Sequence, residues 1–354
     1  MNWTVEQKQA IEREGTNLII SAGAGSGKTA VLSERVLRKL KEGIDIRNIL
    51  ILTFTNEAAG EMKERIRKKI KKEGLTTQLS FIDTAYITTF DAYAFSIVKK
   101  YHYLFNLDSH LSIIESSVIQ LEKKRILDEL IMDLYEQKDE NYLKLVRDFT
   151  TRDDETIKEA ILSISNSLDL HYDKTEYLTS YLEKYYHDDY INQIFQEYFD
   201  YLKNLTVLIE EDYYALESFL PDKVCEKCYQ ALSSLFKPRN YDDLYGKNIQ
   251  LPQFRGLEEE ASPIKEDLKK LVKELNELTI YSEEELKNQV KSTKEYVQAI
   301  IQIILKLDER INEYKREKGA FEFVDIAKMA IKLVKEHPNI REEIKNFYQE
   351  IMID

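Results

Sequence analysis

A run of small residues near the N-terminus ends in a lysine and a threonine. It reads Ala22-Gly23-Ala24-Gly25-Ser26-Gly27-Lys28-Thr29. Small residues let backbone N–H groups close around phosphate oxygens. In such a loop the lysine reaches the β- and γ-phosphates and the threonine hydroxyl holds Mg²⁺. The run matches the Walker A phosphate loop except that Ala22 replaces the first glycine. It therefore predicts a site for ATP and Mg²⁺.

The residues on both sides of this loop favour the same interpretation. Residues 17–21, NLIIS, have the character of a buried strand, and a helical pattern runs from about Lys28 to Lys41. We therefore expect the loop to lie between a strand and the first turn of a helix, where backbone N–H groups and the helix dipole attract anions. The alternative is a glycine-rich turn that happens to precede Lys-Thr.

Upstream of the loop, Thr4 and Gln7 have the spacing of a capping box. In that interpretation the Gln7 side chain accepts from the Thr4 backbone N–H and stabilises the start of a helix. Alternatively, the amide pairs with the edge of adenine, because an amide can both donate and accept. The spacing alone favours the cap, and the two roles can coexist.

Strands and helices alternate in the first part of the chain. Two further apolar strands are predicted there, each followed by a helix, and this alternation indicates βαβ units and a parallel sheet. The predicted strands are residues 49–53 and 86–88, and the predicted helices are about 57–73 and 91–103.

The pattern changes twice along the chain and predicts three segments. Residues 1–110 are α/β, residues 111–318 read as helices without a convincing strand, and α/β character returns over 319–354. One irregular stretch within the helical part, 237–256, holds prolines and glycines and predicts a loop. The last residues, Ile-Met-Ile followed by Asp354, predict an apolar strand that ends in a carboxylate. The fold class is therefore α/β with a large all-α insertion.

Charge and composition limit the class of protein. Residues 1–110 carry 17 Lys and Arg against 13 Asp and Glu, and the remainder carries 34 against 51. The acidity thus belongs to the later region, and local patches decide phosphate binding. No run of 18 apolar residues predicts a membrane span, and the N-terminus lacks the features of a signal peptide.

The two cysteines, Cys225 and Cys228, exclude a disulfide scaffold and favour a reducing cytoplasm. Their spacing suits zinc, but zinc takes four ligands and the sequence holds no second pair. A redox role would need a thioredoxin-like context. Both roles are therefore disfavoured.

Several segments together resemble the motifs of UvrD-like superfamily-one helicases. The early segments resemble the Q motif, motif I, motif Ia and the TFH-type motif, and the late ones resemble the run into the second ATPase motif. Parts of the early segments look closest to the AddA/RecB branch of helicase–nuclease motors. The segments are WTVEQKQAI, NLIISAGAGSGKTAVLSERV, ILILTFTNEAAGEMKERI, ITTFDAYAFSIVKKYHYLFNLD, YKREKGAFEFVDIAKMAIKLV and EIMID.

This resemblance implies a RecA-like P-loop domain, 1A, that is interrupted by a helical domain, 1B. It implies that Gln7 contacts adenine and that Arg35 lies beside the nucleotide, although an exposed position on the helix surface is an equal alternative for Arg35. Asp354 would be the Walker B aspartate, which orients Mg²⁺ through water. The glutamate that follows this aspartate in the family and the second RecA-like domain are not in this sequence.

The resemblance also implies contacts to single-stranded DNA. Phe54 would stack on a base, with core packing as its alternative. Thr55 and Asn56 would bind phosphates or cap the helix that follows them. The residues implied in the DNA path are Thr53, Phe54, Thr55, Asn56, Thr89 and Phe90.

Two features complicate this DNA surface. Asp91 stands where the family has a histidine, and a carboxylate there would repel phosphate. We expect it either to cap its helix or to mark a lost contact. The helix over residues 61–73 holds seven basic residues. They suit a phosphate-binding face, but a solvated face with pairs such as Glu64–Lys68 is the simpler interpretation.

As a whole, the resemblance implies an ATP-dependent helicase that moves 3′→5′ on single-stranded DNA and unwinds duplex in repair or recombination. A second helicase–nuclease subunit is an implied partner, and no membrane is involved. For the chain itself we predict weak nucleotide binding with negligible turnover. The alternatives are a DNA- or partner-binding module without motor activity and a P-loop ATPase unrelated to DNA.

Overall fold

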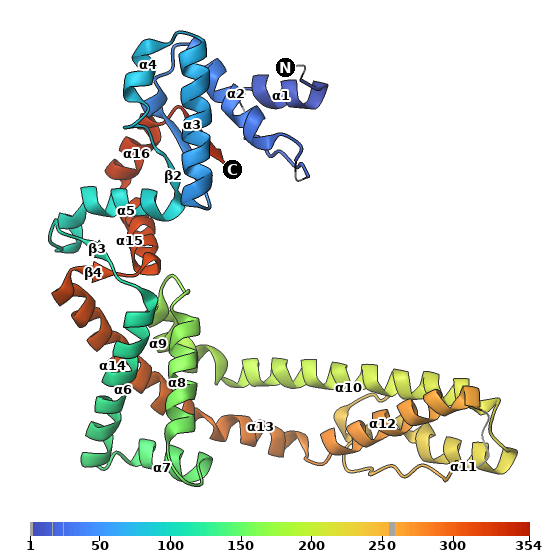
Figure 1. The fold of residues 1–354 in the computed structure, drawn as a ribbon. Helices are drawn as coiled ribbons and strands as arrows, with labels where there is room; N and C mark the ends of the chain where they lie inside the picture. Colours follow the sequence, from blue (N-terminus) through green and yellow to red (C-terminus); the bar gives the residue numbers. More distant parts are fainter. Residues whose placement is uncertain (1–2, 16, 24, 255–258) are drawn as a thin grey trace. The chain divides into compact units, whose positions relative to one another are not determined.

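A computed structural model describes most of the chain (Figure 1). Ala24, in the predicted phosphate loop, and Gly256, in the predicted loop at 237–256, lie outside the described residues. The described residues are 3–15, 17–23, 25–254 and 259–354.

The chain divides into two compact units, which are described separately below. The first is Met1–Ile126 with Glu309–Asp354, and the second is Leu127–Asp308. The predicted segment boundaries at 110/111 and 318/319 fall inside the first unit, because this unit includes the start of helix α6 (Ser116–Glu136) and the end of helix α14 (Lys294–Lys318). By sequence the first unit has 29 Lys and Arg against 25 Asp and Glu, and the second has 22 against 39. The excess of acidic charge therefore belongs to the second unit.

The first unit is built on a three-stranded parallel sheet in the order β2-β1-β5. Its strands are β1 (Ile49–Thr53), β2 (Ile87–Thr89) and β5 (Glu350–Ile353). Every residue of β1 is buried, as befits the central strand of a parallel sheet. The predicted strand at 49–53 and the predicted C-terminal strand are confirmed, and the third lies one residue later than predicted.

Helices cover this sheet and form its core. Val36 and Leu40 of α2 pack with Met62 and Ile66 of α3 against the buried residues of β1. The start of α2, at Lys28, and its end, at Lys41, agree with the prediction. The helices of this unit are α1 (Val5–Glu12), α2 (Lys28–Lys41), α3 (Asn56–Lys72), α4 (Thr76–Phe81), α5 (Phe90–Lys100), α15 (Phe323–Glu336) and α16 (Pro338–Phe347).

The predicted strand at residues 17–21 is wrong: these residues form an irregular segment. Leu18 packs beside α1 and α2, but the side chain of Ile19 is 94% exposed and that of Ile20 is 47% exposed. An apolar run forms a parallel strand where neighbours cover both of its faces and bind its backbone. In the described part of the sheet β5 is the edge strand, and it forms no ladder with this segment.

A second, two-stranded parallel sheet joins β3 (Ser112–Ile113) to β4 (Ala320–Phe321). It corrects the expectation that no strand would occur in residues 111–318. A strand of two residues is too short to show the alternation by which strands are recognised. Its pairing ties the two separate parts of the first unit together.

The second unit is helical in its described residues. Its longest helix, α10 (Asp188–Glu217), packs against α12 (Ser262–Leu278) through buried leucine, isoleucine and tyrosine side chains. None of the described helices is long and apolar enough to cross a membrane. The other helices are α7 (Glu140–Phe149), α8 (Glu155–Leu168), α9 (Lys174–Tyr185), α11 (Asp222–Leu232) and α13 (Glu283–Ser292).

Both cysteines lie in α11, where they contribute to the core of the second unit. Cys228 is fully buried, and Cys225 is partly buried beside it. Burial raises the pKa of the Cys228 thiol to about 11, so this thiol stays protonated and unreactive at neutral pH. In the described part of the chain no three His, Cys, Asp or Glu side chains are placed to hold a metal ion. Cys228 therefore packs as an apolar side chain does, whereas the Cys225 thiol donates to the Glu217 carboxylate (3.7 Å).

Candidate functional site

The predicted phosphate loop leads directly into the first turn of α2, as expected, but an irregular segment precedes it in place of the expected strand. Gly25 and Gly27 have φ values of +76° and +84°, a region that favours glycine because a Cβ would be strained there. Gly27 is the N-cap of α2, and Lys28 is its first residue. The Lys28 ammonium donates to the carbonyl oxygens of Ala22 (2.7 Å) and Gly23 (3.1 Å). Lys28 thus crosses the loop from the first turn of α2, where backbone N–H groups lack partners within a helix.

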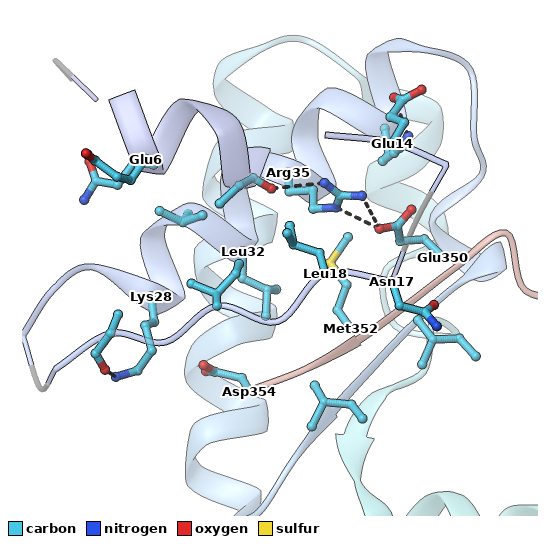
Figure 2. A pocket seen from close by; sticks show the side chains of 18 of the residues that line it. Glu6, Glu14, Asn17, Leu18, Lys28, Leu32, Arg35, Glu350, Met352 and Asp354 are labelled. Carbon is cyan, nitrogen blue, oxygen red and sulfur yellow. Dashed lines mark hydrogen bonds and ion pairs between the residues drawn. The ribbon is translucent and has the colours of Figure 1, made fainter. Parts of the chain in front are cut away.

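An open pocket of about 1320 Å³ adjoins this loop, and all of its lining residues belong to the first unit. It brings together residues from α1, the loop, α2 and β5 (Figure 2). Gly23, Gly25, Gly27 and Thr29 do not line it. The predicted site residues that line it are Gln7, Ala22, Ser26, Lys28, Arg35 and Asp354.

Gln7 forms the predicted capping box and also contacts the loop. Its backbone N–H donates to the Thr4 hydroxyl (3.2 Å), and its side-chain oxygen accepts from the Thr4 N–H (3.0 Å). The side-chain nitrogen donates to the carbonyl oxygen of Ser26 (3.1 Å). The capping interpretation is therefore confirmed. A primary amide has a second N–H, so this contact leaves a donor for a ligand.

Asp354 directly follows β5, and its backbone N–H donates to the carbonyl oxygen of Leu52 in β1 (2.9 Å). Side chains alternate along a strand, so Glu350, Met352 and Asp354 share one side of β5. Figure 2 shows all three beside the pocket. Sequence reasoning overlooked Glu350, although the period of two from Asp354 places it on this side.

Arg35 is not an exposed residue of the helix surface, because only 11% of its side chain is accessible. Its guanidinium binds Glu350 at 2.7 Å. It also donates to the carbonyl oxygens of Ala10 (3.0 Å) and Arg13 (2.8 Å) at the end of α1. Arg35 lines the pocket, yet its nitrogens are directed at oxygen atoms of the protein itself.

The residues implied in DNA binding lie where β1 and β2 end, and they differ in exposure. Phe54 is 78% exposed and Phe90 is 39% exposed, and their ring centroids lie 5.5 Å apart. Core packing of Phe54, the alternative interpretation, is therefore wrong. Thr55 and Asn56 are exposed as well. The pair of rings and the start of α3 form a surface that a base and a phosphate could reach.

Three of the threonines here stabilise the backbone. Thr53 is buried, and its hydroxyl donates to the carbonyl oxygen of Thr55 (3.0 Å). Thr55 caps α3 by accepting from the N–H of Ala58 (3.1 Å). Thr89 is buried and caps α5 by accepting from the N–H of Ala92 (3.2 Å). Thr53 and Thr89 therefore shape the turns that expose Phe54 and Phe90.

Asp91 does not cap its helix, which corrects one of the two expectations for it. Thr89 has the extended backbone of an N-cap and takes this role, and Phe90 is already helical. Asp91 is the second residue of α5 and is exposed. A carboxylate in the first turn is favourable for the helix dipole, which accounts for an aspartate at this position.

The basic residues of α3 fall into two groups. Glu64 pairs with Arg67 (3.0 Å), three residues on, and not with Lys68 as predicted. Lys63 and Arg67 both bind Asp83, and Lys69 binds Glu34. Three of the seven basic residues are thus paired with neighbouring carboxylates. Arg65, Lys68, Lys71 and Lys72 are exposed.

The chain belongs to the UvrD/REP helicase N-terminal domain family, whose model matches residues 3–354.

Among curated proteins the chain is similar to several that are named as the A subunit of an ATP-dependent helicase/nuclease. It is 28% identical to the one from Lactobacillus johnsonii over 99% of the chain and 33% of that protein. It is 31% identical to the one from Alkaliphilus oremlandii over 94% of the chain and 31% of that protein. It is 28% identical to the one from Clostridioides difficile over 99% of the chain and 32% of that protein. The chain thus spans about a third of the length of these relatives.

Proposed function

We propose that this chain is the ATP- and DNA-binding N-terminal part of an ATP-dependent DNA helicase that acts in DNA repair or recombination. The observation that carries the proposal is one pocket in which Lys28, at the first turn of α2, meets Gln7 and Asp354. In this proposal residues 1–110 and 319–354 form a RecA-like P-loop domain, and residues 111–318 form the inserted helical domain. The names of the relatives support a helicase–nuclease subunit that works with a second subunit.

In the proposed nucleotide site, the loop N–H groups and the Lys28 ammonium bind the phosphates. Thr29 and Asp354 hold Mg²⁺, an assignment that suits the preference of this ion for oxygen ligands. The Gln7 side chain donates its remaining amide hydrogen to adenine and accepts a hydrogen bond from adenine with its oxygen. Bound ATP would supply the free energy of phosphoanhydride hydrolysis, and Mg²⁺ would offset negative charge on its phosphates. The chain's own residues bind and orient the nucleotide, and they offset the negative charge of its phosphates.

In the proposed DNA site, the exposed rings of Phe54 and Phe90 stack on bases, and Asn56 with the start of α3 binds phosphate. Stacking is tolerant of sequence because every base has a π-face, which suits a motor that moves along any DNA. The 3′→5′ direction is supported by the resemblance of the motifs alone.

Replacing Phe54 with alanine tests the DNA site. We expect the affinity of the chain for a labelled single-stranded oligonucleotide to fall by roughly 5- to 100-fold, because the loss of one stacked base costs about 1–3 kcal/mol. The slope of log K against log salt should not change, since no phosphate contact is removed. Fluorescence anisotropy at two salt concentrations measures both quantities.

A matched control for that measurement is Phe149→Ala, which removes a 62% exposed phenylalanine from the second unit. It should leave DNA affinity unchanged. Equal affinities of the wild-type chain and the Phe54 variant would contradict the assignment of this ring to DNA.

The chain alone should bind ATP but hydrolyse it negligibly. The resemblance places the glutamate that orients the attacking water after Asp354 and the arginine finger in a second RecA-like domain, and this sequence holds neither. We expect the release of phosphate from ATP by the purified chain to equal that of a Lys28→Ala variant. Steady hydrolysis that disappears in this variant would show that the chain is catalytically complete, against the proposal.

A binding module without motor activity is the second candidate for this chain. The net charge of −17 on the second unit favours a basic protein surface over DNA as the partner of that unit. Binding of DNA to the first unit without any affinity for ATP would favour the module over the motor.

A further inference from the structure

Helix α1 is held in place at its C-terminal end by cationic side chains of α2. The last carbonyl groups of a helix lack partners within it, and cations stabilise them. α1 has no basic residue in its last turn. Arg35 donates to the carbonyl oxygens of Ala10 and Arg13, and Arg38 donates to that of Ile11 (3.1 Å). With eight residues, α1 is too short to be stable by itself. The contacts from Arg35 and Arg38 therefore help to fix its position.

The same guanidinium also reaches β5. Its Nε and Nη2 atoms lie 2.7 Å from one carboxylate oxygen of Glu350, whose side chain is 19% exposed. Glu350 and Asp354 share one side of the strand. Arg35 therefore connects three elements of the pocket, namely α1, α2 and the strand that carries Asp354 (Figure 2). Its Nε, Nη1 and Nη2 atoms all face protein oxygens.

The N-terminal part of α1 carries Gln7, whose position depends on the contacts that Arg35 makes at the other end of the helix. Gln7 lies on α1 and reaches Ser26 of the loop with its amide. A small apolar cluster of Ala10 and Ile11 with Val31 of α2 supports the helix, and Trp3 packs against this cluster. A helix of this length moves as one body, so a shift of its C-terminal end displaces the Gln7 amide from the loop.

We propose that Arg35 is a positioning residue for base recognition. It fixes α1 against α2 and β5, so that the Gln7 amide is placed to bind the base of the nucleotide. It acts through Gln7 and does not contact the nucleotide. This inference rests on the proposed ATP site, and it replaces the role beside the nucleotide that the resemblance implies for Arg35.

The test compares a ligand that has a base with one that has none. ATP and inorganic tripolyphosphate, each with Mg²⁺, are titrated calorimetrically into the wild-type chain, Arg35→Ala, Gln7→Ala and the double variant. We expect each single change to lower ATP affinity by roughly two- to tenfold, the worth of one hydrogen bond. The double variant should lose no more than either single one, and tripolyphosphate affinity should not change in any of them.

Two further measurements separate positioning from general damage. Trp3 is the only tryptophan, and its emission should shift to the red in Arg35→Ala without ligand, because α1 is released. The matched control is Arg47→Ala, which removes an arginine of the same unit that binds Asp45 and does not line the pocket. It should change neither affinity nor emission. If Arg35→Ala does not fold, Glu350→Gln gives the same comparison with Arg35 retained.

The outcomes are distinct. A loss of tripolyphosphate affinity in Arg35→Ala that matches its loss of ATP affinity overturns the inference, and so do effects of Arg35→Ala and Gln7→Ala that multiply in the double variant. Either result means that Arg35 acts on the nucleotide itself, and the proposed ATP site survives. If the wild-type chain binds neither ligand, the proposed site and this inference both fall.

Discussion

Replacing Lys28 with alanine should lower the affinity of the chain for ATP and Mg²⁺ by roughly 10- to 100-fold. A hydrogen bond to a charged group contributes about 1.5–3 kcal/mol. The Lys28 ammonium lies inside the loop, 2.7 Å from the carbonyl oxygen of Ala22, where a phosphate would meet it. The loop N–H groups and the N-terminal end of α2 stay in place, so weak binding should persist. Calorimetric titration of ATP measures the change.

Lys41→Ala is the matched control for this change. Lys41 is the last residue of the same helix, and its half-exposed side chain pairs with Glu73, outside the pocket. Its removal should leave ATP affinity within twofold of the wild-type value. If Lys28→Ala binds ATP as tightly as Lys41→Ala does, the phosphate-loop interpretation is wrong, and the motor function proposed from it loses its main support.

Replacing Lys315 with alanine should destabilise the first unit by about 3–5 kcal/mol, because it leaves two carboxylates in a buried environment without their cation. The Lys315 side chain is 5% exposed and binds Glu322 (2.8 Å) and Asp325 (2.6 Å). Both carboxylates lie at the start of α15, the helix that precedes α16 and β5. Urea unfolding followed by Trp3 fluorescence, which reports on the first unit, measures the loss.

The pH dependence of this difference follows from the charge on Lys315. Burial acts to lower the pKa of Lys315, but Asp325 and Glu322 outweigh it and raise the pKa above its usual value of 10.5. The stabilisation is therefore complete below about pH 10.5 and is lost only as the pH rises through the folded-state pKa. The difference between wild type and variant should be constant from pH 6 to 9.

Lys345→Ala serves as the control, because Lys345 is 65% exposed and its pair with Glu342 is solvated. Exposed pairs contribute about 0–1 kcal/mol. A Lys315 variant that unfolds at the same urea concentration as the Lys345 variant would mean that the buried ion pairs do not stabilise this unit.

Several features could be predicted from the sequence because their causes lie within a few residues of each other. Glycines with positive φ followed by Lys28 determine both the loop and the start of α2. Thr4 and Gln7 form their capping box because both members lie in one helical turn. Residues 49–52 are apolar throughout and Thr53 is β-branched, and this run predicts a strand that is buried on both faces wherever it lies in the sheet.

Other features depend on residues that are distant in the sequence, and only the tertiary structure decided them. Residues 17–21 have the composition of a strand, but a strand also needs partners for its backbone, and the described sheet ends at β5. From the sequence, Arg35 is interpreted either as a nucleotide contact or as an exposed arginine. Its role depends on Glu350, more than 300 residues later, and on carbonyl groups at the end of α1.

Exposure was likewise decided by the fold. Thr53, Phe54 and Thr89 occur in similar motifs, yet the turns at the ends of β1 and β2 bury the two threonines and leave the ring exposed. The motif determined that Lys28 lies at a helix start, because small residues before a lysine allow the tight turn that this geometry needs. Which side chains surround the pocket beside Lys28 was decided by packing, because the hydrogen bonds and ion pairs that orient them join segments that the chain brings together only when it folds.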